Sequence, residues 1–176
     1  MKVKLAAVAS CAAATLLLIA GAAFAAGVFR LTSPAFSAGG IIPVRYTCDG
    51  RGISPPLAWH GVPKGTRSLA LIVDDPDAPR GTFVHWVLYN LPASTTHLAS
   101  GMKAASGTAR FGTNSLGDAA YTGMCPPSGV HHYHFKLYAL DAPLPARGHM
   151  TKAALLRAMR GHELGMAELV GLYRRH

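Results

Sequence analysis

The stretch SLALIVDDPDAP, Ser68–Pro79, is the strongest predictor of the fold. Its first half, Ser68–Val73, has apolar residues at consecutive positions, which is typical of a central strand buried on both faces. Its second half, Asp74–Pro79, places three carboxylates and two prolines directly after that strand. Because proline removes a backbone donor and fixes φ, the stretch predicts a buried strand that ends in a stiff acidic turn.

The segments that follow extend this pattern to a β-rich domain. Thr82–Leu91 is rich in β-branched and aromatic residues and lies between Gly81 and Pro92, which favours a second strand. His132–Leu140 predicts a further strand. Residues 93–125 are rich in Gly, Ala, Ser and Thr, and we expect them to form a long excursion over one end of the sheet.

The C-terminal part of the chain changes its periodicity. Lys152–Arg160 repeats apolar residues at helical spacing, with Thr151 before it as a suitable N-cap. Glu163–Tyr173 repeats the spacing after Gly161, which suits a helix C-terminus. The residues alone therefore predict a mainly β domain with two C-terminal α-helices.

The N-terminus has the pattern of a signal peptide. A short basic start is followed by the uncharged run Leu5–Ala23 and then by small residues at the spacing of a cleavage site. We expect residues 1–25 to be removed by cleavage near Ala25 or Ala26, leaving a single periplasmic or secreted domain. An uncleaved membrane anchor is the alternative, because the apolar run is nearly long enough to span a bilayer.

Charge and cysteine content narrow the range of partners. The formal charge is +9, and it becomes +7 when Lys2 and Lys4 are removed with the leader. A positive charge of this size favours anionic partners such as phosphate ligands or lipid headgroups. The basic residues are scattered rather than clustered with aromatics, so nucleic acid is not expected. Cys48 and Cys125 are the cysteines that remain, and an even pair in an exported protein favours a disulfide, with two free thiols as the alternative.

Strand alternation predicts which polar side chains point inward. In the strand after the acidic turn, His85 shares a face with Val87. In the later strand, His131 and Tyr133 continue an apolar row, whereas His132 points to the opposite face. Because inward imidazole and phenol groups need polar partners when buried, these residues predict a small polar pocket.

Several motifs occur in one order along residues 28–174. They are Tyr46–Gly50, Ile53–Leu57, Asp75–Pro79, His85 followed by an aromatic residue, Cys125-Pro126-Pro127-x-Gly129, His131-x-Tyr133 and the segment Gly161–Gly171. This set resembles the phosphatidylethanolamine-binding protein family, and most closely its bacterial Raf kinase inhibitor-like (YbhB/YbcL-like) branch. Each motif is weak alone, but their shared order makes the resemblance specific.

The resemblance implies a β-sandwich-like fold, in which a large central antiparallel sheet packs with a smaller sheet beside C-terminal helices. It also implies a small pocket for phosphate-like anions, with no catalytic residue, metal or cofactor. The ligand-binding residues would be Asp75, Asp77, His85, Gly123, Cys125, Pro127, His131 and Tyr133. The family commonly has arginine where this chain has His132, so the local charge here would depend on pH.

The chemistry of these groups suits an anion. Imidazole, phenol and loop N–H groups donate to phosphate oxygens. We expect Asp75 to hold a histidine as a donor, and a nearby carboxylate could also meet the ammonium of a phosphoethanolamine headgroup. A carboxylate beside His85 would raise its pKa, so phosphate binding is expected to weaken as the pH rises.

Other functions remain open at this point. The family includes protease inhibitors and kinase-pathway regulators, so a protein target is credible, and a homodimer with peripheral or no membrane contact is compatible with the sequence. A weak hydrolase could use the Asp/His pocket, with Cys125 as nucleophile if unpaired, but no Gly-x-Ser-x-Gly elbow is present. A metal held by Asp77 with His131, His132 and His134 is not expected, because alternation separates the histidines.

Overall fold

The computed structural model describes residues 27–103, 105, 107–145 and 148–175. The elements, in chain order, are β1 (Arg30–Thr32), a 3-10 turn (Val44–Tyr46), β2 (Leu57–His60), β3 (Ser68–Asp75), β4 (Phe83–Pro92), β5 (His97–Leu98), β6 (Arg110–Phe111), β7 (His131–Leu140), α1 (Lys152–Met159) and β8 (Glu163–Tyr173). The expected leader, residues 1–25, lies outside the described residues, so its cleavage stays a prediction.

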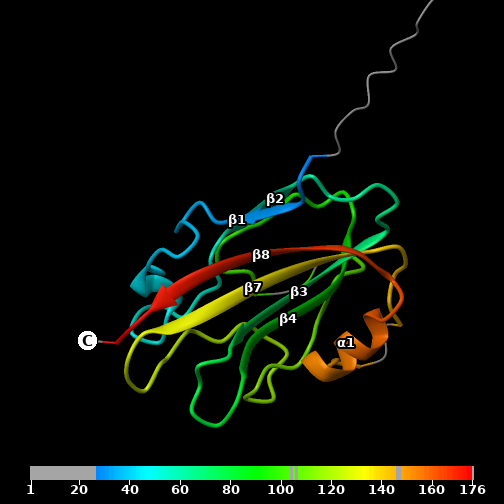
Figure 1. Ribbon diagram of the computed structural model, residues 1–176. Helices are drawn as coiled ribbons and strands as arrows, with labels where there is room; N and C mark the ends of the chain where they lie inside the picture. Colours follow the sequence, from blue (N-terminus) through cyan, green and yellow to red (C-terminus); the bar gives the residue numbers. More distant parts are fainter. Residues whose placement is uncertain (1–26, 104, 106, 146–147, 176) are drawn as a thin grey trace, which may run out of the picture.

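The strands form two antiparallel sheets. The larger sheet has the order β6-β4-β3-β7-β8, and the smaller has the order β1-β2-β5 (Figure 1). β3 lies at the centre of the larger sheet, between β4 and β7, and every one of its residues is buried. This confirms the central strand predicted from Ser68–Val73, because only a strand covered on both faces tolerates such a continuous apolar run.

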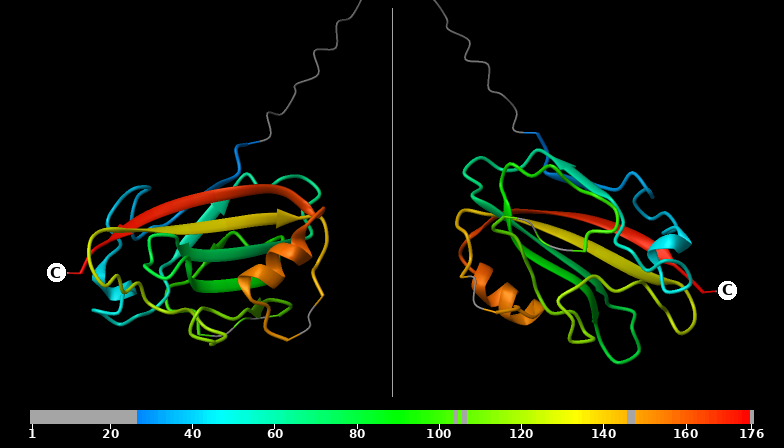
Figure 2. Two further views of the ribbon diagram at one scale, coloured as in Figure 1. Left: turned by 60° about the horizontal axis from the view of Figure 1, so that its bottom comes forward. Right: turned by 180° about the vertical axis from the view of Figure 1, so that it is seen from behind.

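Two apolar clusters cover the two faces of the larger sheet. The cluster between the sheets joins Leu57 and Trp59 of β2 to Phe135 of β7. The cluster on the opposite face includes Leu155 and Met159 of α1, which packs over β3 and β4 away from the smaller sheet (Figure 2). In the described part of the chain, no helix is both long and apolar enough to cross a membrane.

The second predicted C-terminal helix is wrong. Glu163–Tyr173 is strand β8, which pairs with β7 along nearly its whole length. The buried residues of β8 are Ala167, Leu169, Gly171 and Tyr173, so the period is two rather than 3.6. The edge of β7 requires a backbone partner, and glycines weaken a helix, so sheet pairing prevails over the apparent helical spacing.

Candidate functional site

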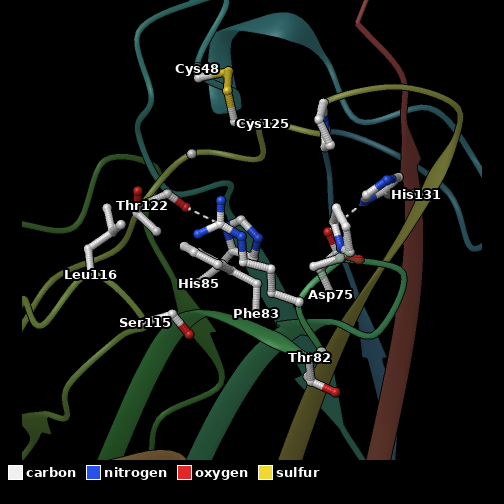
Figure 3. A pocket seen from close by; sticks show the side chains of 16 residues that line it. Cys48, Asp75, Thr82, Phe83, His85, Ser115, Leu116, Thr122, Cys125 and His131 are labelled. Atoms are coloured by element: carbon white, nitrogen blue, oxygen red, sulfur yellow. Dashed lines mark hydrogen bonds and ion pairs between the residues drawn. A yellow bond between two sulfur atoms is a disulfide. The ribbon is translucent and has the colours of Figure 1, made fainter.

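A cavity of about 770 Å³ opens where β3 and β4 run into their connecting turn (Figure 3). Segments 78–83, 115–116 and 122–125 contribute to its walls, and its ionisable side chains include Asp75, His85 and His131. The volume falls within the range of about 300–1,000 Å³ that small-molecule sites occupy. Residues from distant parts of the sequence therefore line one cavity that is large enough for a small-molecule ligand.

A β-bulge in β4 sets the direction of His85. The register with β3 leaves His85 unpaired between Val84 and Trp86, so the bulge shifts the strand alternation by one residue. The His85 ring lies edge-on to Tyr133, with ring centroids 5.3 Å apart, on the side of the sheet that faces the smaller sheet. Val87 packs on the opposite side, under α1, so the prediction that His85 and Val87 share a face is wrong.

The backbone of the neighbouring loop holds the His85 ring. His85 Nδ1 lies 3.0 Å from the carbonyl oxygen of Thr122, and Thr122 N–H donates to the His85 carbonyl at 3.0 Å (Figure 3). Because a carbonyl only accepts, Nδ1 carries a proton, and Nε2 is the ring atom left for a ligand. Burial lowers the pKa of His85, since it disfavours the imidazolium, and the Thr122 carbonyl and Asp75 oppose this only in part.

Asp75 pairs with His131 rather than with His85. His131 Nδ1 donates to Asp75 Oδ2 at 2.8 Å, and the side chains are 8% and 5% exposed (Figure 3). Asp75 Oδ1 accepts from Asp77 N–H at 2.9 Å, so both carboxylate oxygens are engaged. The expectation that Asp75 holds a histidine is confirmed, with His131 as that histidine. The expected rise in the pKa of His85 is wrong, because burial lowers this pKa by more than the Asp75 charge raises it.

Asp77 and Tyr133 lie beside the cavity rather than among the residues that line it. Asp77 Oδ2 accepts from both the backbone N–H and Nδ1 of His132 at 2.8 Å, and these bonds lower the pKa of Asp77. Tyr133 is fully buried next to His85 and His131, and burial raises its pKa. Its hydroxyl has no hydrogen-bond partner among the described residues, so it is an unsatisfied group directly behind the two imidazoles.

A disulfide bond joins two segments of the cavity wall opposite the acidic turn. Cys48 and Cys125 are bonded, with Cα atoms 5.4 Å apart, and both line the cavity (Figure 3). Cys48 N–H also donates to the Met124 carbonyl at 3.0 Å. A Cβ on Gly123 would lie 2.9 Å from the Thr47 carbonyl carbon, so only glycine permits this close approach. The bond confirms the predicted pairing and removes Cys125 as a thiol nucleophile.

Several lining residues were not predicted from the sequence. They are Arg80, Phe83, Ser115, Leu116 and Thr122. Arg80 and Phe83 lie within four residues of Pro79, so their closeness to the acidic turn could have predicted that they line the cavity. The others come from the long excursion, whose path over the sheet end leaves no local pattern in its composition.

Asp74, the remaining acidic residue of the Asp74–Pro79 stretch, forms ion pairs away from the cavity. Asp74 is buried, and its carboxylate accepts from Lys136 Nζ at 3.0 Å and from Lys152 Nζ of α1. It therefore ties α1 to the outer face of the sheet. No group of three or more His, Cys, Asp or Glu side chains with metal-binding geometry occurs in the residues that the structure describes.

The fold and the cavity together define a β-sandwich-like ligand-binding domain. A family model described as phosphatidylethanolamine-binding protein matches residues 32–174, and the chain belongs to this family. A UPF0098 protein of Methanothermobacter thermautotrophicus is 51% identical over 150 residues, covering 83% of this chain and 99% of the relative. A UPF0098 protein of Chlamydia muridarum is 46% identical, covering 82% and 97%.

Solved structures agree with this assignment. A putative phosphatidylethanolamine-binding protein homologue from Chlamydia trachomatis matches with a TM-score of 0.79 and 44% identity, covering 84% of this chain and 98% of that one. YbcL of E. coli, described as a member of the mammalian family, matches with a TM-score of 0.79 and 32% identity, covering 84% and 99%. These descriptions indicate no enzymatic activity.

Proposed function

We propose that this protein is an exported binding protein that takes a phosphate-type anion, free or as a lipid headgroup, in the cavity between the acidic turn and the disulfide. The observation that carries the proposal is the pair of imidazoles, His85 and His131, that line one cavity with their Nδ1 atoms already engaged. Each ring then has Nε2 left for a ligand. The disulfide supports export, because such bonds persist in oxidising compartments.

Binding to these rings couples to proton uptake. With Nδ1 protonated, a neutral imidazole has only a lone pair at Nε2 and must gain a proton to donate to an anion. Burial keeps His85 neutral in the free protein by lowering its pKa, and a bound anion favours the imidazolium. Affinity therefore falls as the pH rises from the free-state pKa to the higher pKa of the complex.

The test is isothermal titration calorimetry with inorganic phosphate, repeated in buffers of different ionisation enthalpy. We expect proton uptake and an affinity that His85→Ala lowers at least about tenfold, since a hydrogen bond to a charged group contributes about 1.5–3 kcal/mol. His60→Ala, at an exposed position on β2, is the matched control and should bind normally. Unchanged phosphate binding by His85→Ala would place the site elsewhere.

Sulfate separates the titration of the protein from that of the ligand, because sulfate does not change its charge between mildly acidic and basic pH. We expect sulfate binding to weaken over the same pH interval as phosphate binding. A sulfate affinity that stays constant would contradict the proposed role of the imidazoles.

A further inference from the structure

The acidic groups near the cavity are already committed to other partners. Asp75 is the one carboxylate among the described lining residues, and its two oxygens bind His131 Nδ1 and Asp77 N–H. Its side chain is 5% exposed. Asp77 lies outside the lining and holds His132. A ligand ammonium would have to break the bond between His131 and Asp75 to reach a carboxylate here.

A permanent positive charge lies on the same cavity. Arg80 lines it from the turn between β3 and β4, directly after Pro79 and before Gly81, which has φ 92°. Arg80 is exposed and makes no side-chain hydrogen bond or ion pair with the residues that the structure describes. A guanidinium binds phosphate oxygens through two parallel hydrogen bonds, and it repels a second cation at any accessible pH.

The cavity is larger than a phosphate ion requires. Five heavy atoms need on the order of 150 Å³, taking about 30 Å³ for each water-sized group, against a cavity of about 770 Å³. The remaining wall is largely apolar, with Phe83, Leu116, Pro79 and Pro127 among its residues. An organic substituent of the phosphate would thus meet apolar surface and Arg80, with no unengaged carboxylate among the described residues that line the cavity.

From this arrangement, and resting on the proposed phosphate site, we propose that the cavity selects phosphate esters whose organic part is uncharged and discriminates against esters that carry an ammonium group. Arg80 is the specificity-determining residue: it attracts the phosphate and repels an amine. The ethanolamine headgroup that gives the family its description is then a poor ligand for this chain, and an uncharged phosphomonoester is a good one.

The test compares ethyl phosphate with phosphoethanolamine, which differ by the ammonium group. For the unaltered protein we expect ethyl phosphate to bind about three- to tenfold more tightly by calorimetry, the size expected of partly screened charges. Arg80→Gln should bring the ratio close to one, and Arg80→Glu should reverse it. Because Arg80 is exposed, neither variant should change the melting temperature appreciably.

Arg157→Gln is the matched control, since it removes one exposed positive charge on α1, away from the cavity lining. This variant should keep the full preference for ethyl phosphate. A preference that persists in Arg80→Gln, or that falls equally in Arg157→Gln, would show that overall charge is responsible and would overturn the role of Arg80. Equal or tighter binding of phosphoethanolamine by the unaltered protein would overturn the selectivity itself.

Water-soluble dihexanoyl lipids identify the source of the ester. Tighter binding of dihexanoyl phosphatidate than of ethyl phosphate would assign a lipid, the reverse order would assign a free ester, and either supports the proposal. Tighter binding of dihexanoyl phosphatidylethanolamine than of the phosphatidate would overturn it. If inorganic phosphate also fails to bind and His85→Ala changes nothing, the proposed function falls as a whole, an outcome distinct from phosphate binding without selectivity.

Discussion

Two neighbouring residues of β7 form the same kind of pair in different surroundings. His131 and His132 each place Nδ1 2.8 Å from an aspartate at or just beyond the C-terminal end of β3, Asp75 and Asp77 respectively. The side chains of His131 and Asp75 are 8% and 5% exposed, whereas those of His132 and Asp77 are 53% and 41% exposed. The two pairs have the same Nδ1–Oδ2 distance and differ in burial. Water screens the exposed pair, whereas each member of the buried pair has lost its contact with water and needs the other as its hydrogen-bond partner.

The largest expected effect is the loss of stability when the buried pair is broken, compared with the loss when the exposed pair is broken. Asp75→Ala should lower the free energy of unfolding by about 3 kcal/mol, because it leaves a buried imidazole without its acceptor. Asp77→Ala should cost less than about 1 kcal/mol, as for an exposed pair. Urea denaturation at neutral pH measures both values, and equal losses would contradict the contrast.

Ligand binding sharpens the same comparison. His131→Asn should weaken phosphate binding at least about tenfold, because it removes a lining donor. His132→Asn, one residue away on the outer face, should leave the affinity within about twofold. Calorimetry on both variants measures these affinities, and a larger loss in His132→Asn would move the site to the outer face of the sheet.

The pH dependence of stability gives a smaller effect. Burial lowers the pKa of His85 below its ordinary 6.5, so the unfolded chain takes up the proton first as the pH falls. The stability from neutral His85 is present above pH 6.5 and is lost as the pH falls through the folded-state pKa, by up to about 1.4 kcal/mol per pH unit. Denaturation of His85→Asn at several pH values should show a shallower loss, and an unchanged slope would argue against buried, neutral His85.

Asp77 loses its contribution in a different pH interval. Its hydrogen bonds with His132 lower its pKa below 3.8, so its stabilisation is present above that value and is lost only as the pH falls through the lower folded-state pKa. His85 therefore contributes to the loss of stability in mild acid, and Asp77 to the loss in strong acid.

The smallest expected effect is that of His132→Arg. Arginine is the residue that the family resemblance implies at this position, and it would make the outer pair with Asp77 permanently ionic. We expect a change in unfolding free energy within about 1 kcal/mol and no change in phosphate affinity. Thermal denaturation and calorimetry measure these, and a strong change in affinity would show that the outer pair contributes to the site.

The sequence predicted the central strand and the disulfide correctly, and several of its candidate site residues line the cavity. Ser68–Val73 could be assigned to a buried strand because few other structures accommodate a short continuous apolar run. The Cys48–Cys125 bond could be predicted because paired cysteines in an exported chain favour a disulfide. Asp75, His85 and His131 were recognised as polar residues beside buried strands. The strand and the polar positions are local signals, since each depends on residues within a few positions of one another, whereas the disulfide followed from the cysteine count and the leader.

The errors have a shared cause in long-range pairing. Apolar residues in Glu163–Tyr173 fit a helix as well as a strand, and only the free edge of β7 makes this segment a strand. The bulge that turns His85 away from Val87 depends on its register with β3, which no local pattern records.

The amino-acid sequence by itself determined the β-rich class of this protein, its acidic turn and the residue types of a polar cavity. Only the tertiary structure decided that Asp75 holds His131, that the bulge directs His85 into the cavity, and that Arg80 lines it beside engaged carboxylates. The physical reason is that burial and hydrogen-bond partners are fixed by strand register and loop path, which join residues far apart in the chain.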